Sequence, residues 1–329
     1  MRYLPIVAFK EAKVCSFHPS HSSLWFESSG TTNSGRSIRS RHWLQSHDLY
    51  QASVIMGWKW FLEMQNAECR MQDIQSKQGK ANFVGVMPSF QENPHSSLSC
   101  MVDILMREFG DGEDFWCMKS GGWDWCGFCT HLQRLEREGQ PTILFGIALG
   151  WVHFLDWCKS HKQRFHLPPS TLILETGGYK GHRREFKHSK LHRSLSQLFG
   201  VNPRHIQSEY SMCELSSQAY SFSIKDARGK IHIVFRFPPW CRYRVVYPDS
   251  SMRVPKGKKG VLEIQDLANL DSCAFLRTED LVVERGDGFE WIGRLPKTGL
   301  KGCSLALEDS AELNIACNKD SNLSLQHST

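Results

Sequence analysis

The first long periodic stretch of the chain covers residues 43–66, where apolar side chains recur at helical spacing without an interrupting proline. This spacing predicts a long helix. Beyond it, short apolar runs alternate with further stretches of helical spacing. The short runs predict strands, which we expect at residues 82–87, 114–118, 142–147, 171–175 and 205–209. The stretches between them predict helices at residues 97–109, 125–138, 149–161 and 184–199.

This alternation predicts an α/β fold with a mostly parallel sheet flanked by helices on both faces. After about residue 220 the pattern changes to short apolar runs separated by Gly, Pro and Asp. These runs predict a smaller antiparallel β subdomain, with strands at 231–237, 242–247, 260–265, 280–284 and 289–292. We therefore expect an α/β core over residues 1–220, a β subdomain over 221–294 and a short C-terminal segment over 295–329 with a frayed tail.

Composition narrows the class of protein. Apolar residues make up 40% of the 329 positions, and 11 tryptophans with 19 phenylalanines exclude a disordered chain. The N-terminus lacks the apolar core of a signal peptide, and no apolar run reaches the roughly 18 residues of a membrane span. The 12 cysteines are scattered. This combination predicts a cytoplasmic protein with free thiols and no transmembrane segment.

The net charge of +6 arises from 40 basic and 34 acidic residues, and such a mild excess suits a small anionic ligand. Basic residues gather around positions 180–193 without the regular interleaving of aromatic residues that a nucleic-acid surface shows. We therefore expect no nucleic-acid partner.

A candidate phosphate loop follows the apolar run that ends at Phe26. It reads Ser28, Ser29, Gly30, Thr31, Thr32. Glycine lets the backbone approach a ligand closely, and successive N–H groups in such a turn form a concavity that binds anions. Clusters of Ser, Thr and Gly are also ordinary loop material. From this stretch alone, a phosphate loop and a polar turn are equally compatible with the sequence.

Polar residues that follow the predicted strands are the next candidates, because ligands of parallel sheets bind beyond the carboxyl ends of the strands. Gly177 and Gly178 come directly after one strand, and a tight βα turn would need glycine there too. Tyr210 and Glu214 follow the next strand. An aromatic ring beside a carboxylate suits a nucleotide base and a metal-bound phosphate, and Mg²⁺ prefers oxygen ligands. A lone glutamate can equally be a carboxylate in the first turn of a helix.

Two charged residues in the β-rich region complete the set. Asp280 closes the sequence Arg-Thr-Glu-Asp, and Arg294 follows a glycine after the last predicted strand. A carboxylate at a strand end can accept hydrogen bonds from both hydroxyls of a ribose, and an arginine can face phosphate. Each residue taken alone is ordinary.

A Cys-x-x-Cys pair offers a separate metal hypothesis. Cys126 and Cys129, with Cys117 upstream and His131 downstream, have the ligand types for zinc. No second Cys-x-x-Cys is present and the stretch is predicted to be a helix, so we favour buried structural cysteines.

Taken together and in this order, the motifs resemble the adenylate-forming superfamily, and within it most the acyl-protein synthetases of bacterial luminescence. The resemblance runs from about residue 3 to about residue 307 and includes further stretches, among them residues 87–90, 145–153, 175–181 and 301–305. It implies that residues 28–32 cradle the β- and γ-phosphates of ATP. It further implies that Gly177 and Gly178 lie beside adenine and the acyl group.

The resemblance assigns the remaining roles as well. Tyr210 would stack near adenine, Glu214 would hold Mg²⁺, Asp280 would bind the ribose, and Arg294 would contact ribose or phosphate. The implied enzyme is an acid–thiol ligase that uses ATP and Mg²⁺ to convert a long-chain fatty acid to an acyl-adenylate.

In this family the acyl group passes to an enzyme cysteine and feeds a fatty acyl reductase. Cys303 is the natural candidate, with Lys301 favouring its thiolate; the alternative is a small buried residue. Two further alternatives stay open, namely an acyl- or aryl-CoA ligase with CoA as acceptor, and a catalytically impaired relative.

The sequence departs from the family pattern at several points. Asn33 stands where a glycine is usual, and Ser211 and Cys213 replace Gly and Thr between Tyr210 and Glu214. The chain begins almost at the family's first motif, and the C-terminal lid of typical adenylating enzymes is absent from it. These departures are the reason that a relative with reduced or lost activity stays open as an alternative.

Overall fold

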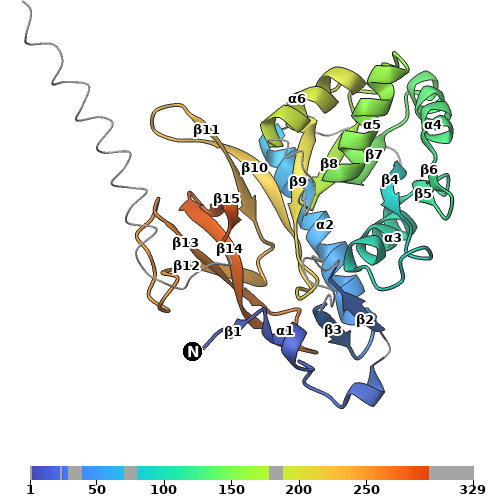
Figure 1. Ribbon diagram of the computed structural model, residues 1–329. Helices are drawn as coiled ribbons and strands as arrows, with labels where there is room; N and C mark the ends of the chain where they lie inside the picture. Colours follow the sequence, from blue (N-terminus) through green and yellow to red (C-terminus); the bar gives the residue numbers. More distant parts are fainter. Residues whose placement is uncertain (1, 23, 29–38, 70–79, 178–187, 296–329) are drawn as a thin grey trace, which may run out of the picture.

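The computed structural model describes residues 2–22, 24–28, 39–69, 80–177 and 188–295 (Figure 1). Its helices are α1 (Ala8–Glu11), α2 (Asp48–Cys69), α3 (Ser97–Phe109), α4 (Trp125–Glu138), α5 (Ala148–Ser160) and α6 (His188–Phe199), with 3₁₀ turns η1 (Pro19–His21) and η3 (Pro203–His205).

The strands up to the end of the parallel region are β1 (Leu4–Pro5), β2 (Leu24–Glu27), β3 (Arg41–Leu44), β4 (Asn82–Pro88), β5 (Phe115–Lys119), β6 (Gly122–Trp123), β7 (Thr142–Ile147), β8 (Leu172–Thr176) and β9 (Ile206–Tyr210). The later strands are β10 (Ala219–Lys225), β11 (Ile231–Arg236), β12 (Cys241–Val246), β13 (Lys259–Asp266), β14 (Phe275–Arg285) and β15 (Gly288–Arg294).

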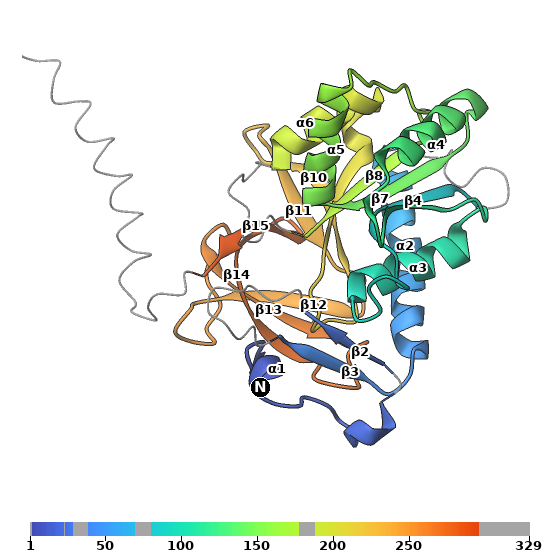
Figure 2. The same ribbon diagram turned by 45° about the vertical axis from the view of Figure 1, so that its right-hand side comes forward.

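Five strands form the parallel part of one large sheet, in the order β5, β4, β7, β8, β9. Figure 2 shows α2 and α3 on one side of these strands and α4, α5 and α6 on the other. The strands read as apolar runs because helices cover both faces. Phe83 packs toward α2 and α3, whereas its neighbour Val84 packs toward α4, α5 and α6. The α/β fold expected from the sequence is confirmed.

The antiparallel part continues the same sheet. β10 pairs antiparallel with β9, and the order then runs β11, β15, β14, β13, β12. The expected antiparallel strands are therefore present, and β14 is longer than expected. The boundary expected at residue 220 falls inside β10, and the division into a core and a subdomain stays a prediction.

The helix expected from residue 43 begins later in the structure. Trp43 and Leu44 belong to β3, which pairs with β2 as an antiparallel hairpin in the register Leu24↔Leu44. In β3 the buried residues His42 and Leu44 alternate with more exposed ones, as in a half-buried strand. The helical expectation was wrong over residues 43–47, because the apolar residues Trp43 and Leu44 also fit the spacing of α2, which begins at Asp48.

None of the helices in the described ranges is long and apolar enough to cross a membrane.

Candidate functional site

Asp280 lies at the centre of the candidate site, on β14. Tyr210 Oη, at the end of β9, donates a hydrogen bond to Asp280 Oδ2 at 2.8 Å. Trp291 Nε1 donates to Asp280 Oδ1 at 3.2 Å, and Arg294 Nε lies 3.3 Å from the same oxygen. The structure thus brings together Tyr210, Asp280 and Arg294, three of the residues that the sequence predicts for the site.

The electrostatics of this group follow from its burial. Asp280 is only 3% exposed, and its carboxylate is neutralised by the guanidinium of Arg294. Burial raises the pKa of Tyr210 well above its usual value, and the charge and hydrogen bond of Asp280 raise it further. Tyr210 therefore keeps its proton and stays a donor to Asp280.

Arg294 differs from the other two partners of Asp280 in its exposure. Its side chain is 48% exposed, so the guanidinium is already partly hydrated and can turn toward solvent or a ligand at little cost in free energy. A carboxylate offers about four acceptor positions, of which Tyr210, Trp291 and Arg294 use three. If Arg294 turns away, Asp280 has two free acceptor positions, which is the number that two ribose hydroxyls require.

Three phenylalanine rings pack around the ring of Tyr210. Its ring centroid lies 5.8 Å from that of Phe235, 6.3 Å from Phe237 and 5.5 Å from Phe289. These rings come from β11, β15 and the segment after β11, so the antiparallel strands fix the orientation of a side chain on the last parallel strand.

Glu214 lies in the buried segment that follows β9. Asn269 Nδ2 donates to the backbone oxygen of Glu214 at 2.8 Å. Asp266 accepts hydrogen bonds from the backbone N–H groups of Ser216 and Ser217 at 3.0 and 2.9 Å. The residue Glu214 is itself buried, and its negative charge adds to the rise in the pKa of Tyr210. These contacts hold the backbone of the segment, so that Glu214 lies close enough to Tyr210 for its charge to act on it.

His42 also holds this segment, and sequence reasoning missed its role. The ring is fully buried, with Nδ1 2.9 Å from Cys213 O and Nε2 2.9 Å from Asn269 Oδ1. Burial lowers the pKa of His42 to about 4, against the opposing effect of these two oxygens. Its partners lie 171 and 227 positions away, so no local pattern could have revealed it.

Of the remaining expected site residues, the structure describes only Gly177 and Ser28, each the last residue of a described range. Gly177 follows β8 with φ +73°, a left-handed conformation that favours glycine, and a Cβ there would meet no atom within 4 Å. Ser28 Oγ accepts a hydrogen bond from Ser40 N at 3.0 Å, which closes the β2–β3 hairpin. The other expected residues lie outside the described residues: Ser29, Gly30, Thr31, Thr32, Gly178, Lys301 and Cys303.

A second polar group lies next to the first, at the ends of β8 and β9. Glu175 Oε1 lies 2.7 Å from His188 Nδ1 and 3.5 Å from His192 Nε2, and it accepts a hydrogen bond of 2.5 Å from Ser208 Oγ. Burial acts to raise the pKa of Glu175, but the two histidines outweigh it and hold that pKa at about 2. The hydrogen bond to Glu175 in turn raises the pKa of His188.

Glu209, on β9, is also a buried carboxyl group, but its pKa is shifted in the opposite direction to that of Glu175. Its pKa is raised to about 7, mainly by burial; hydrogen bonds from Thr176 and Ser211 oppose this rise and the charge of Glu175 adds to it. Near neutral pH this group is therefore partly protonated. It lies on β9 directly before Tyr210, opposite the end of β8 that precedes Gly177.

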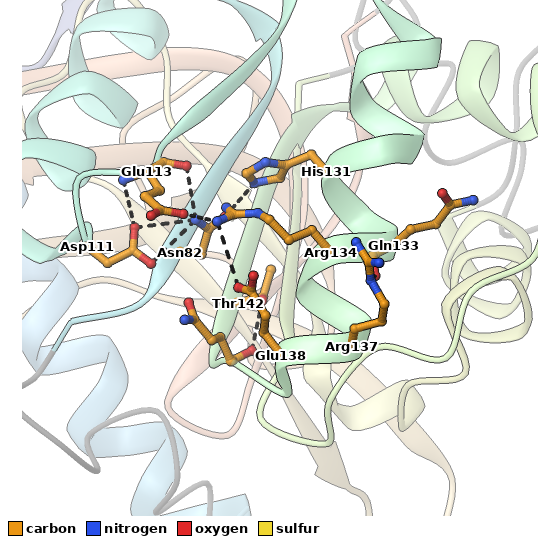
Figure 3. Close-up of polar contacts among 10 residues, drawn as sticks. Asn82, Asp111, Glu113, His131, Gln133, Arg134, Arg137, Glu138 and Thr142 are labelled. Atoms are coloured by element: carbon orange, nitrogen blue, oxygen red, sulfur yellow. Dashed lines mark hydrogen bonds and ion pairs between the residues drawn. The ribbon is translucent and has the colours of Figure 1, made fainter.

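A third polar network lies at the opposite, amino-terminal edge of the parallel strands (Figure 3). Asn82 Nδ2 donates to Glu113 O at 3.0 Å and to Asp111, while its Oδ1 lies 2.8 Å from His131 Nε2. Arg134 pairs with Glu113. All groups that face Asn82 are satisfied within the network, so we regard it as structural.

The Cys-x-x-Cys hypothesis is not supported by the positions of its members. Cys126 is exposed, whereas Cys117 and Cys129 are buried, and His131 is bonded to Asn82. In the part of the chain that the structure describes, the one group of three side chains placed to share a metal ion is Glu175, His188 and His192.

Comparison with known families identifies the family of the chain. The model of the family described as "Acyl-protein synthetase, LuxE" matches residues 122–311, which is more than half of the chain. The chain belongs to the LuxE family. The match includes Tyr210, Glu214, Asp280 and Arg294 as well as the second polar group.

Two curated relatives of this LuxE family member are named long-chain-fatty-acid–luciferin-component ligase. The one from Vibrio harveyi is 22% identical over 190 residues, covering 55% of this chain and 48% of the relative. The one from Aliivibrio fischeri is 21% identical over 196 residues, covering 56% of this chain and 50% of the relative. The aligned region is thus about half the length of each relative.

Solved structures share the fold. ATP-bound MatB from Rhodopseudomonas palustris superposes with a TM-score of 0.54 at 14% identity, covering 84% of the LuxE-family chain and 49% of MatB. 2-Hydroxyisobutyryl-CoA ligase in complex with 2-HIB-AMP gives a TM-score of 0.56 at 13% identity, covering 90% and 58%. The fold is therefore that of adenylate-forming enzymes.

Proposed function

We propose that this protein is an ATP-dependent acid–thiol ligase that activates a long-chain fatty acid as acyl-adenylate and transfers the acyl group to a cysteine thiol. The observation that carries the proposal is the convergence of Tyr210 and Arg294 on the buried carboxylate of Asp280. Membership of the LuxE family and the ligase names of the two relatives support it.

In the proposed complex with ATP, Asp280 accepts hydrogen bonds from the ribose hydroxyls once Arg294 turns to the nucleotide. Arg294 then contacts ribose or phosphate as a planar, permanently charged donor. Tyr210 lies beside adenine, and the turn at Gly177 and Gly178 lies beside adenine and the acyl group. Residues 28–32 hold the β- and γ-phosphates.

The first half-reaction joins carboxylate and nucleotide. A carboxylate oxygen of the fatty acid attacks the α-phosphorus, the bond to the bridging oxygen breaks, and pyrophosphate leaves. The protein contributes mainly by positioning the two substrates and by neutralising charge.

Glu214 is the residue that would hold Mg²⁺. A carboxylate is the kind of oxygen ligand that this ion prefers, and phosphate oxygens and water would be its other ligands. When bound, the ion would neutralise charge on the phosphates.

In the second half-reaction the thiolate of Cys303 attacks the carbonyl carbon of the acyl-adenylate. A C–S bond forms, the bond to the phosphate oxygen breaks, and AMP leaves. Lys301 favours the thiolate over the thiol. The resulting thioester is the form in which a fatty acyl reductase partner would receive the acyl group.

Mass spectrometry of the intact protein tests the proposal. After incubation with ATP, Mg²⁺ and a mixture of long-chain fatty acids, we expect the mass of one acyl group to be added. Hydroxylamine should release it, and Cys303→Ser should abolish it. The control Cys126→Ser, which removes an exposed thiol, should keep it.

Other outcomes would contradict the proposal in distinct ways. AMP release that requires CoA and persists in Cys303→Ser would identify a CoA ligase. ATP binding without any fatty-acid-dependent release of pyrophosphate would identify a non-catalytic relative.

A further inference from the structure

Glu175, His188 and His192, here called the Glu–His–His group, lie together at the junction of β8 and α6. The two histidines are four residues apart on α6, so their rings project from the same face of the helix. One ligand atom from each of the three side chains lies within 4.8 Å of the other two. This pattern of two imidazoles and a carboxylate is the ligand set of several three-ligand zinc sites.

The distances within the group suit one small ion. A zinc ion bound at about 2.0–2.2 Å by nitrogen and oxygen has ligand atoms a little over 3 Å apart. Here Glu175 Oε1 lies 2.7 Å from His188 Nδ1 and 3.5 Å from His192 Nε2. An ion between these atoms therefore needs only small rotations of the side chains.

The carboxylate itself is incompletely satisfied. Glu175 is 1% exposed, and its Oε2 atom is buried without a hydrogen-bond partner among the described residues. A buried carboxylate oxygen without a partner is costly, and a cation held by both oxygens of the carboxylate would remove this cost. The unpartnered Oε2 therefore points to a bound cation, in addition to the close approach of the three side chains.

Ser208 supplies the outer contact that metal sites usually have. Its Oγ donates a 2.5 Å hydrogen bond to Glu175 Oε1 and lies 3.4 Å from His192 Nε2. Such a contact orients a metal-binding carboxylate, and its loss typically weakens metal binding about 10- to 100-fold.

We propose that Glu175, His188 and His192 bind one divalent transition-metal ion of the zinc class, with Ser208 orienting the carboxylate. Imidazole nitrogen and carboxylate oxygen suit zinc, whereas Mg²⁺ prefers oxygen alone. The site is therefore chemically distinct from the one proposed at Glu214. The ion would join the end of β8 to the first turn of α6, next to the turn at Gly177. The inference does not depend on the adenylation proposed above.

The competing account is that His188 simply shares a proton with Glu175. That account explains the 2.7 Å contact and the effect of His192 on the pKa of Glu175, but it leaves Oε2 without a partner among the described residues. The two accounts predict different metal content.

Metal binding by the full chain distinguishes them. The protein is stripped with a chelator and titrated with Zn²⁺ against a fluorescent zinc chelator, and Co²⁺ absorption serves as a second readout. We expect one equivalent of Zn²⁺. Affinity should fall at least tenfold in His188→Gln and His192→Gln, and about tenfold in Ser208→Ala. The control His166→Gln, at a histidine whose side chain is 84% exposed, should bind as the parent does.

Two results would overturn the proposal. The first is the absence of binding in the parent protein, which identifies a proton-sharing pair. The second is binding that none of the three variants weakens, which places the ion elsewhere. Circular dichroism of each variant separates loss of the ligand from loss of the fold. Because Ser208→Ala removes only a hydroxyl group and the Co²⁺ spectrum is read on the unmutated chain, a variant that does not fold leaves the test intact.

Discussion

Asp280 is the residue on which the candidate site depends. Three donors from β9 and β15 share its two oxygens, and its carboxylate is buried. Hydrogen bonds to charged groups contribute about 1.5–3 kcal/mol each, so a change of charge here affects stability and, under the proposed function, the binding of ATP.

Asp280→Asn tests this dependence. The amide keeps the shape of the side chain but cannot accept at both positions or neutralise Arg294. We expect the free energy of unfolding to fall by about 2 kcal/mol and ATP binding to weaken by about tenfold or more, measured by urea unfolding and calorimetric titration. The matched control Glu279→Gln, at the neighbouring exposed carboxylate, should change neither. Unaltered ATP affinity in Asp280→Asn would exclude Asp280 as a ligand of the nucleotide.

Glu209 makes stability depend on pH. Its pKa rises from 4.5 to about 7 on folding, so between these values the native state holds a proton that the unfolded chain has released. The free energy of unfolding therefore falls as the pH rises through this window, by up to about 3 kcal/mol from this group.

Glu209→Gln removes that dependence because the amide does not ionise. Urea unfolding at pH 5, 6, 7 and 8 should show the parent losing more stability than the variant between pH 5 and 7. Parallel curves for the two proteins would show that Glu209 titrates normally in the folded state.

At the scale of elements, the parallel strands were the most predictable part. β4, β7 and β8 are buried on both faces, so each is a continuous apolar run that local inspection detects. The β2–β3 hairpin was not predictable, because its register joins Leu24 to Leu44 across 20 positions and Trp43 also fits the helical spacing of α2. β10 was missed because its sequence alternates small and polar residues with aromatic ones.

The candidate site was predictable only through family resemblance. Spacing alone does not show that Tyr210, Asp280 and Arg294 meet, because their meeting depends on how β9, β14 and β15 are arranged in the sheet. Neither residue spacing nor family resemblance predicted the role of His42, because its contacts are with the backbone of Cys213 and with Asn269, both far away in the sequence.

His42→Ala tests whether β3 holds the segment after β9. The change removes two hydrogen bonds and leaves Asn269 Oδ1 and Cys213 O without this partner, so we expect a loss of about 2–4 kcal/mol in the free energy of unfolding. The exposed His21 provides the control, and His21→Ala should stay within about 0.5 kcal/mol of the parent. A loss of similar size in both variants would contradict a special role for His42.

At the scale of the whole molecule, one sheet runs from β6 to β12 and contains both the parallel and the antiparallel strands. Its continuity through β9 and β10 predicts that both parts unfold together. Gly85→Ala disturbs one end, because a Cβ there would meet Trp116 Cε3 at 2.4 Å, and overpacking of this kind costs roughly 1–3 kcal/mol.

Hydrogen exchange under native conditions checks this continuity. We expect Gly85→Ala to lower protection in β13 as much as in β8, because both would exchange through the same global opening. Gly121→Ala, where a Cβ meets no atom within 4 Å, is the control. Unchanged protection in β12, β13 and β14 would instead support two separately unfolding units, with a boundary near residue 220.

Trp291 contacts both Asp280 and the Glu–His–His group. Its Nε1 donates to Asp280, and its ring centroid lies 6.1 Å from that of His188. An ion that fixes His188 would therefore also restrict the indole that orients Asp280. Thermodynamic reciprocity then applies: if zinc changes the affinity for ATP by some factor, ATP must change the affinity for zinc by the same factor. Measuring the affinity for ATP with and without Zn²⁺ would therefore also give the effect of ATP on zinc binding.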